Sequence, residues 1–271
     1  MKFLRSFFEN EKIEYYSVLP YFACRETSAH IMRREAFSPQ SVVIFLIPYY
    51  AGETENLSRY AAARDYHIYI KEVNERLAAE IKKHFPDASV KGYGDHSPID
   101  ERSAALIAGL GILGDNGLLI NEKYGSYVFI ADLVTDLPPE IFGDFQPSAI
   151  KKCEGCGACL KACPTGILRG DGSDCLSAIT QKKGELSEAE IALMREYNTA
   201  WGCDICQSSC PHNGAPALTP ISFFHRDRVT ALTKSALDAM SDEEFSSRAF
   251  AWRGRKTVER NVESLESKLH L

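Results

Sequence analysis

Apolar residues recur along the first half of the chain in patterns that predict both strands and helices. The run SVVIFLIPYY at residues 41–50 is continuously apolar and rich in β-branched residues, as in a strand buried on both faces. Between residues 66 and 84 the apolar positions return at helical spacing, which predicts an amphipathic helix. GLLIN (117–121) and SYVFIADLVT (126–135) indicate two further strands. Strands and helices mixed in this way favour an α/β or α+β fold.

Helix-start signals occur at three places along the chain. In the segment 97–100, Ser97 occupies a cap position and Pro98 the first helical position, so we expect a helix that ends near Gly109. Ser187 and Ser241 each open a capping-box sequence, S-x-x-E, and predict two short helices in the second half. The proline-rich stretch 136–148 is the best candidate for a linker between domains.

Composition and charge place the chain among globular proteins. Its 271 residues are 45% hydrophobic, enough for a real core in one large domain or two ordinary ones. The 31 basic and 37 acidic residues give a net charge of −6, so no global field attracts nucleic acid or anionic lipid. Charged residues interrupt the apolar runs near the N-terminus. We therefore expect neither a signal peptide nor a membrane span, and a cytoplasmic protein.

The nine cysteines are distributed very unevenly. Residues 1–145 contain only Cys24, whereas the other eight lie between positions 153 and 210. Thiols concentrated in this way in a reducing compartment indicate metal ligation or catalysis rather than a disulfide framework. Cys24 lies outside the pattern, and a buried structural role is the favoured interpretation for it.

The eight remaining cysteines fit the pattern of two iron–sulfur clusters. CEGCGACLKACP at residues 153–164 has the C-x2-C-x2-C-x3-C-P spacing of bacterial ferredoxins, in which the fourth cysteine ligates a second cluster. We assign one 4Fe–4S cluster to Cys153, Cys156, Cys159 and Cys210. We assign the other to Cys163, Cys175, Cys203 and Cys206. Zinc is the competing interpretation, but the two Cys-Pro endings and the crossed spacing have no purpose in a zinc ribbon.

Two such clusters form a path for electrons, and the large first domain is the natural place for their acceptor. Here the sequence resembles the epoxyqueuosine reductase family over nearly its whole length. The similar segments in the first half are SRYAAARDYH (58–67), GDHSPIDER (94–102), AGLGILGDNGLLI (108–120) and YGSYVFIADLVTD (124–136). The cysteine region and SDEEFSSRAFAWRGRKTVERN (241–261) continue the resemblance.

The resemblance implies a domain organisation and a set of cofactors. It implies a nitroreductase-like domain over residues 1–145 that binds base-off cobalamin. A ferredoxin-like module with two 4Fe–4S clusters would follow over residues 146–215, and a short helical segment over residues 216–271 would pack on both. The implied activity is reduction of epoxyqueuosine to queuosine in tRNA, by a monomer that receives electrons from a low-potential donor such as ferredoxin or flavodoxin.

The resemblance also implies site residues. Asp95 matches the family's proton donor; its alternative role is to precede the helix that Ser97 would cap. The candidate cofactor-binding residues are Arg59, Tyr60, Asp65, Tyr66, His67, Ser126, Ser177 and Asp204. Without the resemblance, the polar and aromatic residues between positions 59 and 67 would be interpreted as an ion-pair network in the core.

Two departures from the family leave alternatives open. Asp115 stands where the family usually has a lysine, which reverses a charge near the expected site. We also expect a short form of the enzyme, without the C-terminal helical-repeat extension of many members. Both features favour a cobalamin-dependent paralogue with a different substrate. An iron–sulfur electron carrier without cobalamin is the alternative from another functional class.

Overall fold

A computed structural model describes residues 2–170, 172 and 174–267 and divides the chain into two compact units. The first unit comprises residues 1–49 and 67–155, and the second comprises residues 50–66 and 156–271. None of the helices that the structure describes combines the length and the apolar character needed to cross a membrane.

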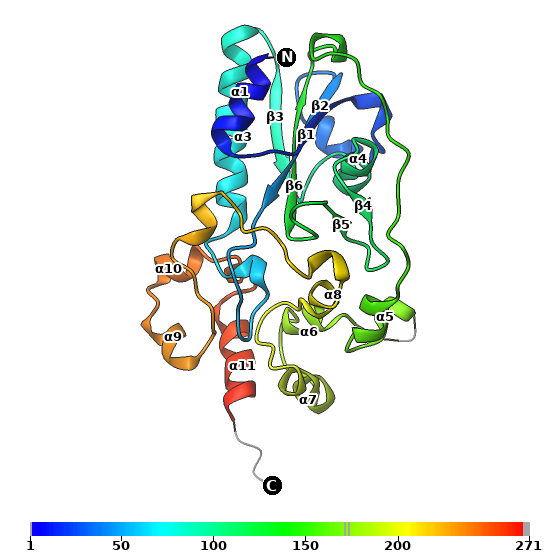
Figure 1. Cartoon of the computed structure of the whole chain (residues 1–271). Helices are drawn as coiled ribbons and strands as arrows, with labels where there is room; N and C mark the ends of the chain where they lie inside the picture. Colours follow the sequence, from blue (N-terminus) through cyan, green and yellow to red (C-terminus); the bar gives the residue numbers. More distant parts are fainter. Residues whose placement is uncertain (1, 171, 173, 268–271) are drawn as a thin grey trace. The chain divides into compact units, whose positions relative to one another are not determined.

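The first unit is built on a four-stranded antiparallel sheet with the strand order β1-β2-β6-β3 (Figure 1). Its strands are β1 (Tyr16–Pro20), β2 (Ser41–Pro48), β3 (Val90–Gly94) and β6 (Val128–Thr135). The central strands β2 and β6 pair along their whole length, from Ser41 opposite Thr135 to Pro48 opposite Val128. The strands expected at residues 41–50 and 126–135 are thereby confirmed, and β2 is buried throughout.

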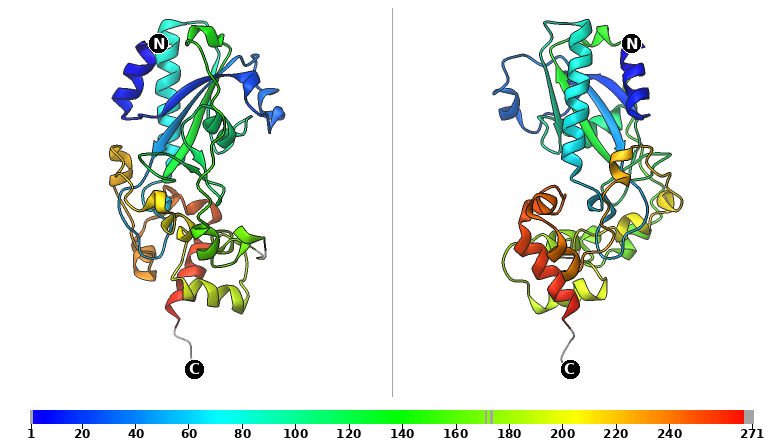
Figure 2. Two further views of the ribbon diagram at one scale, coloured as in Figure 1. Left: turned by 45° about the vertical axis from the view of Figure 1, so that its right-hand side comes forward. Right: turned by 90° about the vertical axis from the view of Figure 1, so that its left-hand side faces the viewer.

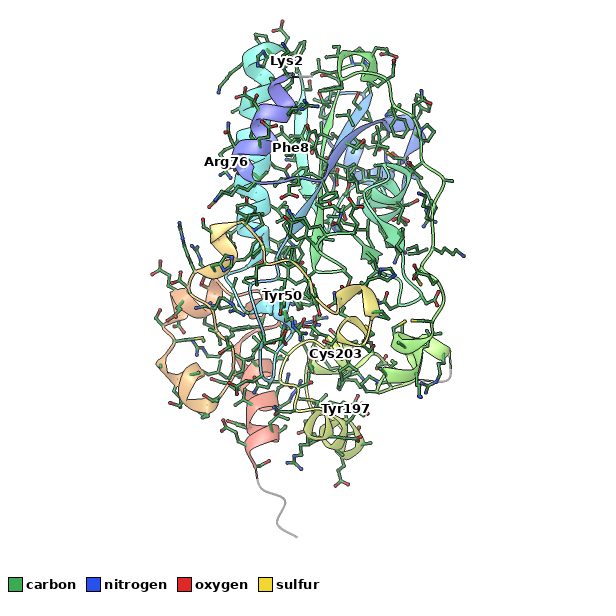
Figure 3. All side chains as sticks on the ribbon, in the orientation of Figure 1. Lys2, Phe8, Tyr50, Arg76, Tyr197 and Cys203 are labelled. Carbon is green, nitrogen blue, oxygen red and sulfur yellow. The ribbon has the colours of Figure 1, made fainter. Side chains whose placement is uncertain are left out.

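Two helices cover one face of this sheet (Figures 1 and 2). They are α1 (Lys2–Glu11) and α3 (Tyr66–His84), the second of which confirms the helix expected over residues 66–84. Phe8 of α1 packs on Phe45 of β2, with 5.3 Å between the ring centroids. Arg76 of α3 donates two hydrogen bonds of 2.7 Å to the Glu11 carboxylate of α1 (Figure 3). The two helices are therefore fixed both to the sheet and to each other.

The other face of the sheet packs against α4 (Glu101–Ile107) and the hairpin of β4 (Ile112–Leu113) and β5 (Leu119–Ile120). The start expected for this helix was wrong. Its N-cap is Asp100, whose side chain accepts from the Ser103 amide at 2.9 Å. Ser97 lies before the helix, where its hydroxyl donates to Asp132 at 3.1 Å and accepts from the Ile99 amide at 3.3 Å. The remaining helical elements of this unit are α2 (Ala29–Met32) and the 3₁₀ turns Tyr21–Ala23 and Pro139–Ile141.

The second unit consists of short helices joined by irregular segments. The helices are α5 (Ala158–Ala162), α6 (Leu176–Thr180), α7 (Glu188–Glu196), α8 (Ile205–Ser208), α9 (Lys234–Ala239), α10 (Asp242–Ser246) and α11 (Arg255–Glu266). Ser187 forms a complete capping box with Glu190, and the Ser241 hydroxyl accepts from the Glu244 amide. Both helix starts expected in this half are confirmed. The 3₁₀ turns are Arg59–Ala61, Ile167–Arg169, Pro211–Asn213, Ser222–His225 and Ala251–Arg253.

Residues 50–66 belong with the second unit because they pack into its core. Leu57 and Ala61 are buried in a cluster with Trp201 and Phe250, and Trp201 itself is fully buried. The amide of Ala200 donates to the Asn56 carbonyl at 2.7 Å. The three-part division at residues 145 and 215 stays a prediction, from which the two compact units differ: residues 50–66 and 216–271 share one unit with most of the cysteine region.

Candidate functional site

The second unit carries most of the clustered cysteines at the ends of its shortest helices. Cys159 lies within α5, Cys163 is the C-cap of α5, and Cys175 is the N-cap of α6. Cys163 and Cys210 both precede a proline and are extended, with ψ of 117° and 126°. Proline therefore ends the helical backbone at both of these thiols. Cys203, just before α8, is labelled in Figure 3.

The four thiols expected to hold one cluster act on one another within this unit. Burial raises the pKa of Cys203 to about 12; a hydrogen bond from the Ile205 amide opposes this increase, and the charges of Cys175 and Cys206 contribute to it. Burial also raises the pKa of Cys206 to about 11, with smaller contributions from Cys175, Cys163 and Cys159. These thiols therefore lie near enough to influence one another electrostatically, and their assignment to one cluster stays a prediction. Cys159, assigned to the other set, acts on Cys206 as expected for two clusters in one small module.

The surroundings of Cys163 favour the thiolate. Burial opposes ionisation, but hydrogen bonds from the amides of Leu168, Thr165 and Gly166 and from the Thr165 hydroxyl lower the pKa of Cys163. Gly166 adopts a left-handed φ of 72°, which glycine tolerates without strain. Because the thiolate is the form that ligates iron, this nest of donors fits an iron–sulfur ligand.

Cys153 lies in a different unit from the other seven clustered cysteines, since the boundary between the units falls after Gly155. Its amide donates to the Leu113 carbonyl at 2.9 Å, which joins the segment to the β4–β5 hairpin. Cys156, Cys159 and Cys210, assigned to the same cluster, belong to the second unit. The composition of this first set stays a prediction.

The loop that follows β3 presents Asp95 at the surface of the first unit. Its carboxylate lies 3.4 Å from His67 Nε2, and the two side chains are 53% and 51% exposed. The backbone of Asp95 has φ of 63°, a left-handed conformation that aspartate tolerates better than most residues. Its amide bonds to the Glu101 carboxyl group. Two residues on, Ser97 is buried and bonded to Asp132, so both ends of the loop are fixed.

Glu101 and Asp132 form an acidic pair behind this loop that the sequence analysis missed. Asp132 is 0% exposed, in the middle of strand β6. Burial raises the pKa of Asp132, and hydrogen bonds from Ser97 and Glu101 offset part of that effect. Burial raises the pKa of Glu101 as well, and the charges of Asp132 and Asp95 add to the increase. The available signal was the single acidic residue inside the apolar run VFIADLV.

Two of the expected cofactor-binding residues, Arg59 and Asp204, satisfy each other. The amide and the guanidinium of Arg59 both donate to Asp204 Oδ2, at 2.7 and 3.1 Å, and the Ser58 hydroxyl donates to Oδ1. The Arg59 guanidinium also pairs with Glu53. The two side chains of the central pair are only 14% and 10% exposed. This is the ion-pair network that residue types alone favoured for the segment.

The other expected cofactor-binding residues are divided between the units. In the second unit, the Tyr60 hydroxyl accepts from Trp201 Nε1 at 2.9 Å, and its ring lies 6.3 Å from that of Tyr66. Asp65 donates its amide to the Ser247 carbonyl, and the Ser177 hydroxyl accepts from Gln181 at 3.0 Å. In the first unit, His67 faces Asp95, and Ser126 is buried just before β6. A cofactor-binding role for these residues stays a prediction.

Asp115 lines a cavity of about 310 Å³ in the first unit. The cavity lies at the turn of the β4–β5 hairpin, and Arg102 and Lys152 bring two positive charges to it. The Arg102 guanidinium donates to the Gly117 carbonyl at 2.6 Å, which holds the turn against α4. Asp115, the residue at which the sequence departs from the resemblance, therefore lines a surface cavity that it shares with two basic side chains.

Both the Asp95 region and the cysteine region match models of known protein families. Residues 33–96 match the family model of epoxyqueuosine reductase QueG (DUF1730), and residues 152–213 match the 4Fe-4S double cluster binding domain. An epoxyqueuosine reductase from Cyclobacterium marinum is 35% identical over 76% of this chain and 68% of its own length. The chain belongs to the epoxyqueuosine reductase family. The mixed α/β fold and the double 4Fe–4S module expected from the sequence are confirmed.

Other members of the family extend the comparison. The epoxyqueuosine reductase from Listeria monocytogenes is 31% identical over 83% of this chain. The chain spans 63%, 54% and 59% of the length of the relatives from Listeria monocytogenes, Staphylococcus aureus and Leadbetterella byssophila. The solved structure of epoxyqueuosine reductase from Streptococcus thermophilus matches 97% of this chain and 79% of its own, with a TM-score of 0.77 at 23% identity. A further structure, of epoxyqueuosine reductase with an epoxyqueuosine-modified tRNA-Tyr stem loop, matches 97% of this chain and 80% of its own (TM-score 0.74, 23% identity).

Proposed function

We propose that this protein is a cobalamin- and iron–sulfur-dependent reductase that converts epoxyqueuosine to queuosine in tRNA. The observation that carries the proposal is membership of the epoxyqueuosine reductase family together with the double 4Fe–4S module in the same chain. The structure of a reductase with an epoxyqueuosine-modified stem loop supports tRNA as the substrate here.

The reaction sets the tasks that the residues must perform. Reduction of an epoxide to an alkene takes up two electrons and two protons and releases one water molecule. The eight clustered cysteines would hold the two clusters, which would supply electrons from a low-potential donor such as ferredoxin or flavodoxin. Cobalamin bound without its lower base supplies a strongly reducing, nucleophilic centre. The protein positions the epoxide, excludes water and delivers protons.

Asp95 is the residue that we assign to proton delivery. Its carboxylate is half exposed beside His67, so it is accessible to a bound group, and its backbone is fixed by Glu101. The alternative role at the helix start is taken by Asp100, which caps α4. A positioned general acid contributes about 10²–10⁴ to a rate.

The two units offer different kinds of support to the cofactor. In the first unit, the half-exposed side chains of Asp95 and His67 suit direct contact with a bound corrin. In the second unit, Arg59 and Asp204 already satisfy each other, so we assign them the indirect task of fixing the turn at residues 58–61. The remaining candidates keep the proposed binding role.

Turnover of epoxyqueuosine-containing tRNA tests the proposal. With reconstituted clusters, cobalamin and a low-potential reductant, we expect queuosine from the wild type and a loss of about 10²–10⁴ in rate for Asp95→Asn. Asp87→Asn, an exposed aspartate in the turn before β3, is the matched control and should keep the wild-type rate. Equal rates for Asp95→Asn and the control would contradict the role of Asp95. No turnover by the wild type would contradict the proposed substrate.

Asp115 favours a second candidate, a cobalamin-dependent paralogue that acts on another substrate. Its carboxylate lines a cavity with Arg102 and Lys152 at the position where the resemblance predicts a lysine. If the chain is such a paralogue, Asp115→Lys should raise turnover of epoxyqueuosine-containing tRNA. If epoxyqueuosine is its own substrate, the same variant should leave turnover unchanged or lower it.

A further inference from the structure

Asp132 occupies an unusual place for an acidic residue. It is fully buried on a central strand, paired in register with Ile44 of β2 and Tyr93 of β3. Its neighbours at two-residue spacing, Ile130 and Val134, belong to the apolar layer between the sheet and α4. An ionised carboxylate without a counter-charge is strongly unfavourable in such a layer. Its partners must therefore explain why it is tolerated.

The hydrogen-bond partners of Asp132 indicate that one proton is held between Asp132 and Glu101. Oδ2 of Asp132 accepts from the Ser97 hydroxyl at 3.1 Å, and the Glu101 carboxyl group lies close enough to Asp132 for a hydrogen bond if one of the two is protonated. Oδ1 of Asp132 and Oε1 of Glu101 are both buried, and neither has a donor. Two carboxyl groups can share a hydrogen bond only if one of them is protonated. A single proton between them would satisfy both oxygens.

Among the residues that the structure describes, the groups that act most strongly on this pair carry no positive charge. Asp132 acts on the Cys24 thiol, whose pKa burial raises to about 12. It also acts on the Tyr93 hydroxyl, whose pKa is raised mainly by burial and further by Glu35 and Asp132. The charges that act on Glu101 are those of Asp132 and Asp95, and both are acidic. A proton held by the pair is thus the way to neutralise one of its charges.

The pair is joined directly to the loop that carries Asp95. Glu101 accepts from the Asp95 amide, at a residue with the left-handed φ of 63°. Asp132 holds Ser97, two residues further along the same loop. The Asp95 amide and the Ser97 hydroxyl, on either side of His96, are therefore each bonded to one member of the pair.

We propose that Glu101 and Asp132 share one proton and act as the positioning pair of the Asp95 loop. In this arrangement the singly protonated pair keeps Asp95 in its left-handed conformation and its carboxylate at the surface. The inference rests on the proposed function, to which it adds two residues that act through Asp95 and not on the substrate. Loss of the shared proton would leave two buried carboxylates in repulsion, and the loop would be released.

Hydrogen–deuterium exchange of the Asp95 amide tests this inference without substrate or cobalamin. The full chain with reconstituted clusters would be compared with three variants, using fragmentation that resolves residues 93–97. Glu101→Ala removes the acceptor of the Asp95 amide, so we expect exchange about tenfold faster than in the wild type. Glu101→Gln keeps an acceptor for Asp95 and adds a permanent donor to Asp132, so we expect exchange within about threefold of the wild type. Glu75→Gln on the exposed surface of α3 is the control.

The pH dependence of amide protection distinguishes a shared proton from a hydrogen bond that does not titrate. After correction for intrinsic exchange, wild-type protection should fall on going from about pH 6 to about pH 10, while Glu101→Gln should keep its protection. The inference would be overturned if the Asp95 amide of Glu101→Ala exchanged as slowly as that of the wild type. It would also be overturned if Glu101→Gln lost protection with rising pH to the same extent as the wild type. If Glu101→Ala does not fold, the comparison of wild type with Glu101→Gln still decides. Because no turnover is measured, a failure here is distinct from a failure of the proposed reaction.

Discussion

The cysteine region and the Asp95 region hold their reactive groups in opposite ways. The cysteines of the second unit recur at short spacings, within or beside helices of four or five residues, and two of them are followed directly by proline. Asp95, Glu101 and Asp132 instead come from a loop, a helix and a strand, and the antiparallel pairing of β3 with β6 brings them together. Local spacing is therefore enough to recognise the first kind of site. The second kind depends on sheet register.

The largest effect is expected when a single cluster ligand is replaced. Cys206→Ser should lower the iron content from about eight to about four per chain, because one cluster loses a thiolate. Cys24→Ser is the matched control: Cys24 packs against the core of the first unit, and its substitution should leave the iron content unchanged. Eight irons in Cys206→Ser would contradict the assignment of that cysteine.

A smaller effect, on stability, is expected when the glycine beside the ligand Cys203 is replaced. Gly202 has φ of 72°, and an added Cβ would lie 2.5 Å from Ser58 Cβ and 3.4 Å from the Tyr60 ring. Gly202→Ala should lower the free energy of unfolding by about 2–5 kcal/mol through strain and overlap. Gly184 also has a positive φ, of 81°, but an added Cβ there would meet open space. Gly184→Ala should therefore lower the free energy of unfolding by about 1–2 kcal/mol. Urea unfolding followed by tryptophan fluorescence measures both, and equal losses would contradict the overlap with Ser58.

The smallest expected effect is a dependence of stability on pH in the sheet unit. Burial raises the pKa of Asp132 and Glu101 above ordinary carboxyl values, so the folded state binds more protons than the unfolded state in that window. Wild-type stability should therefore fall as the pH rises through it. Asp132→Asn removes this titration and should gain on the order of 1–2 kcal/mol relative to the wild type between about pH 5 and pH 9. If the difference in unfolding free energy between Asp132→Asn and the wild type did not change with pH, the raised pKa values would be contradicted.

The same contrast explains what the sequence could predict. The strand at residues 41–50 and the helix at residues 66–84 were predictable because burial follows directly from their apolar patterns. The ligand spacing of the cysteines was also local. The start of α4 was misplaced because Asp100 caps the helix, while Ser97 is held by Asp132, 35 residues away, a contact that no local pattern reveals. The Glu101–Asp132 pair was missed for the same reason, and the pairing of Arg59 with Asp204, 145 residues apart, was likewise only visible in the fold.

The proposal that both regions serve one reaction is tested most directly by the content of iron and cobalt. The protein would be purified without oxygen, reconstituted with iron and sulfide, incubated with cobalamin and separated from the excess by gel filtration. About eight irons and about one cobalt per chain, with the spectrum of base-off cobalamin, are the predicted result. About eight irons with no retained cobalt and no base-off spectrum would contradict it. The protein would then be an electron carrier whose first unit docks a partner.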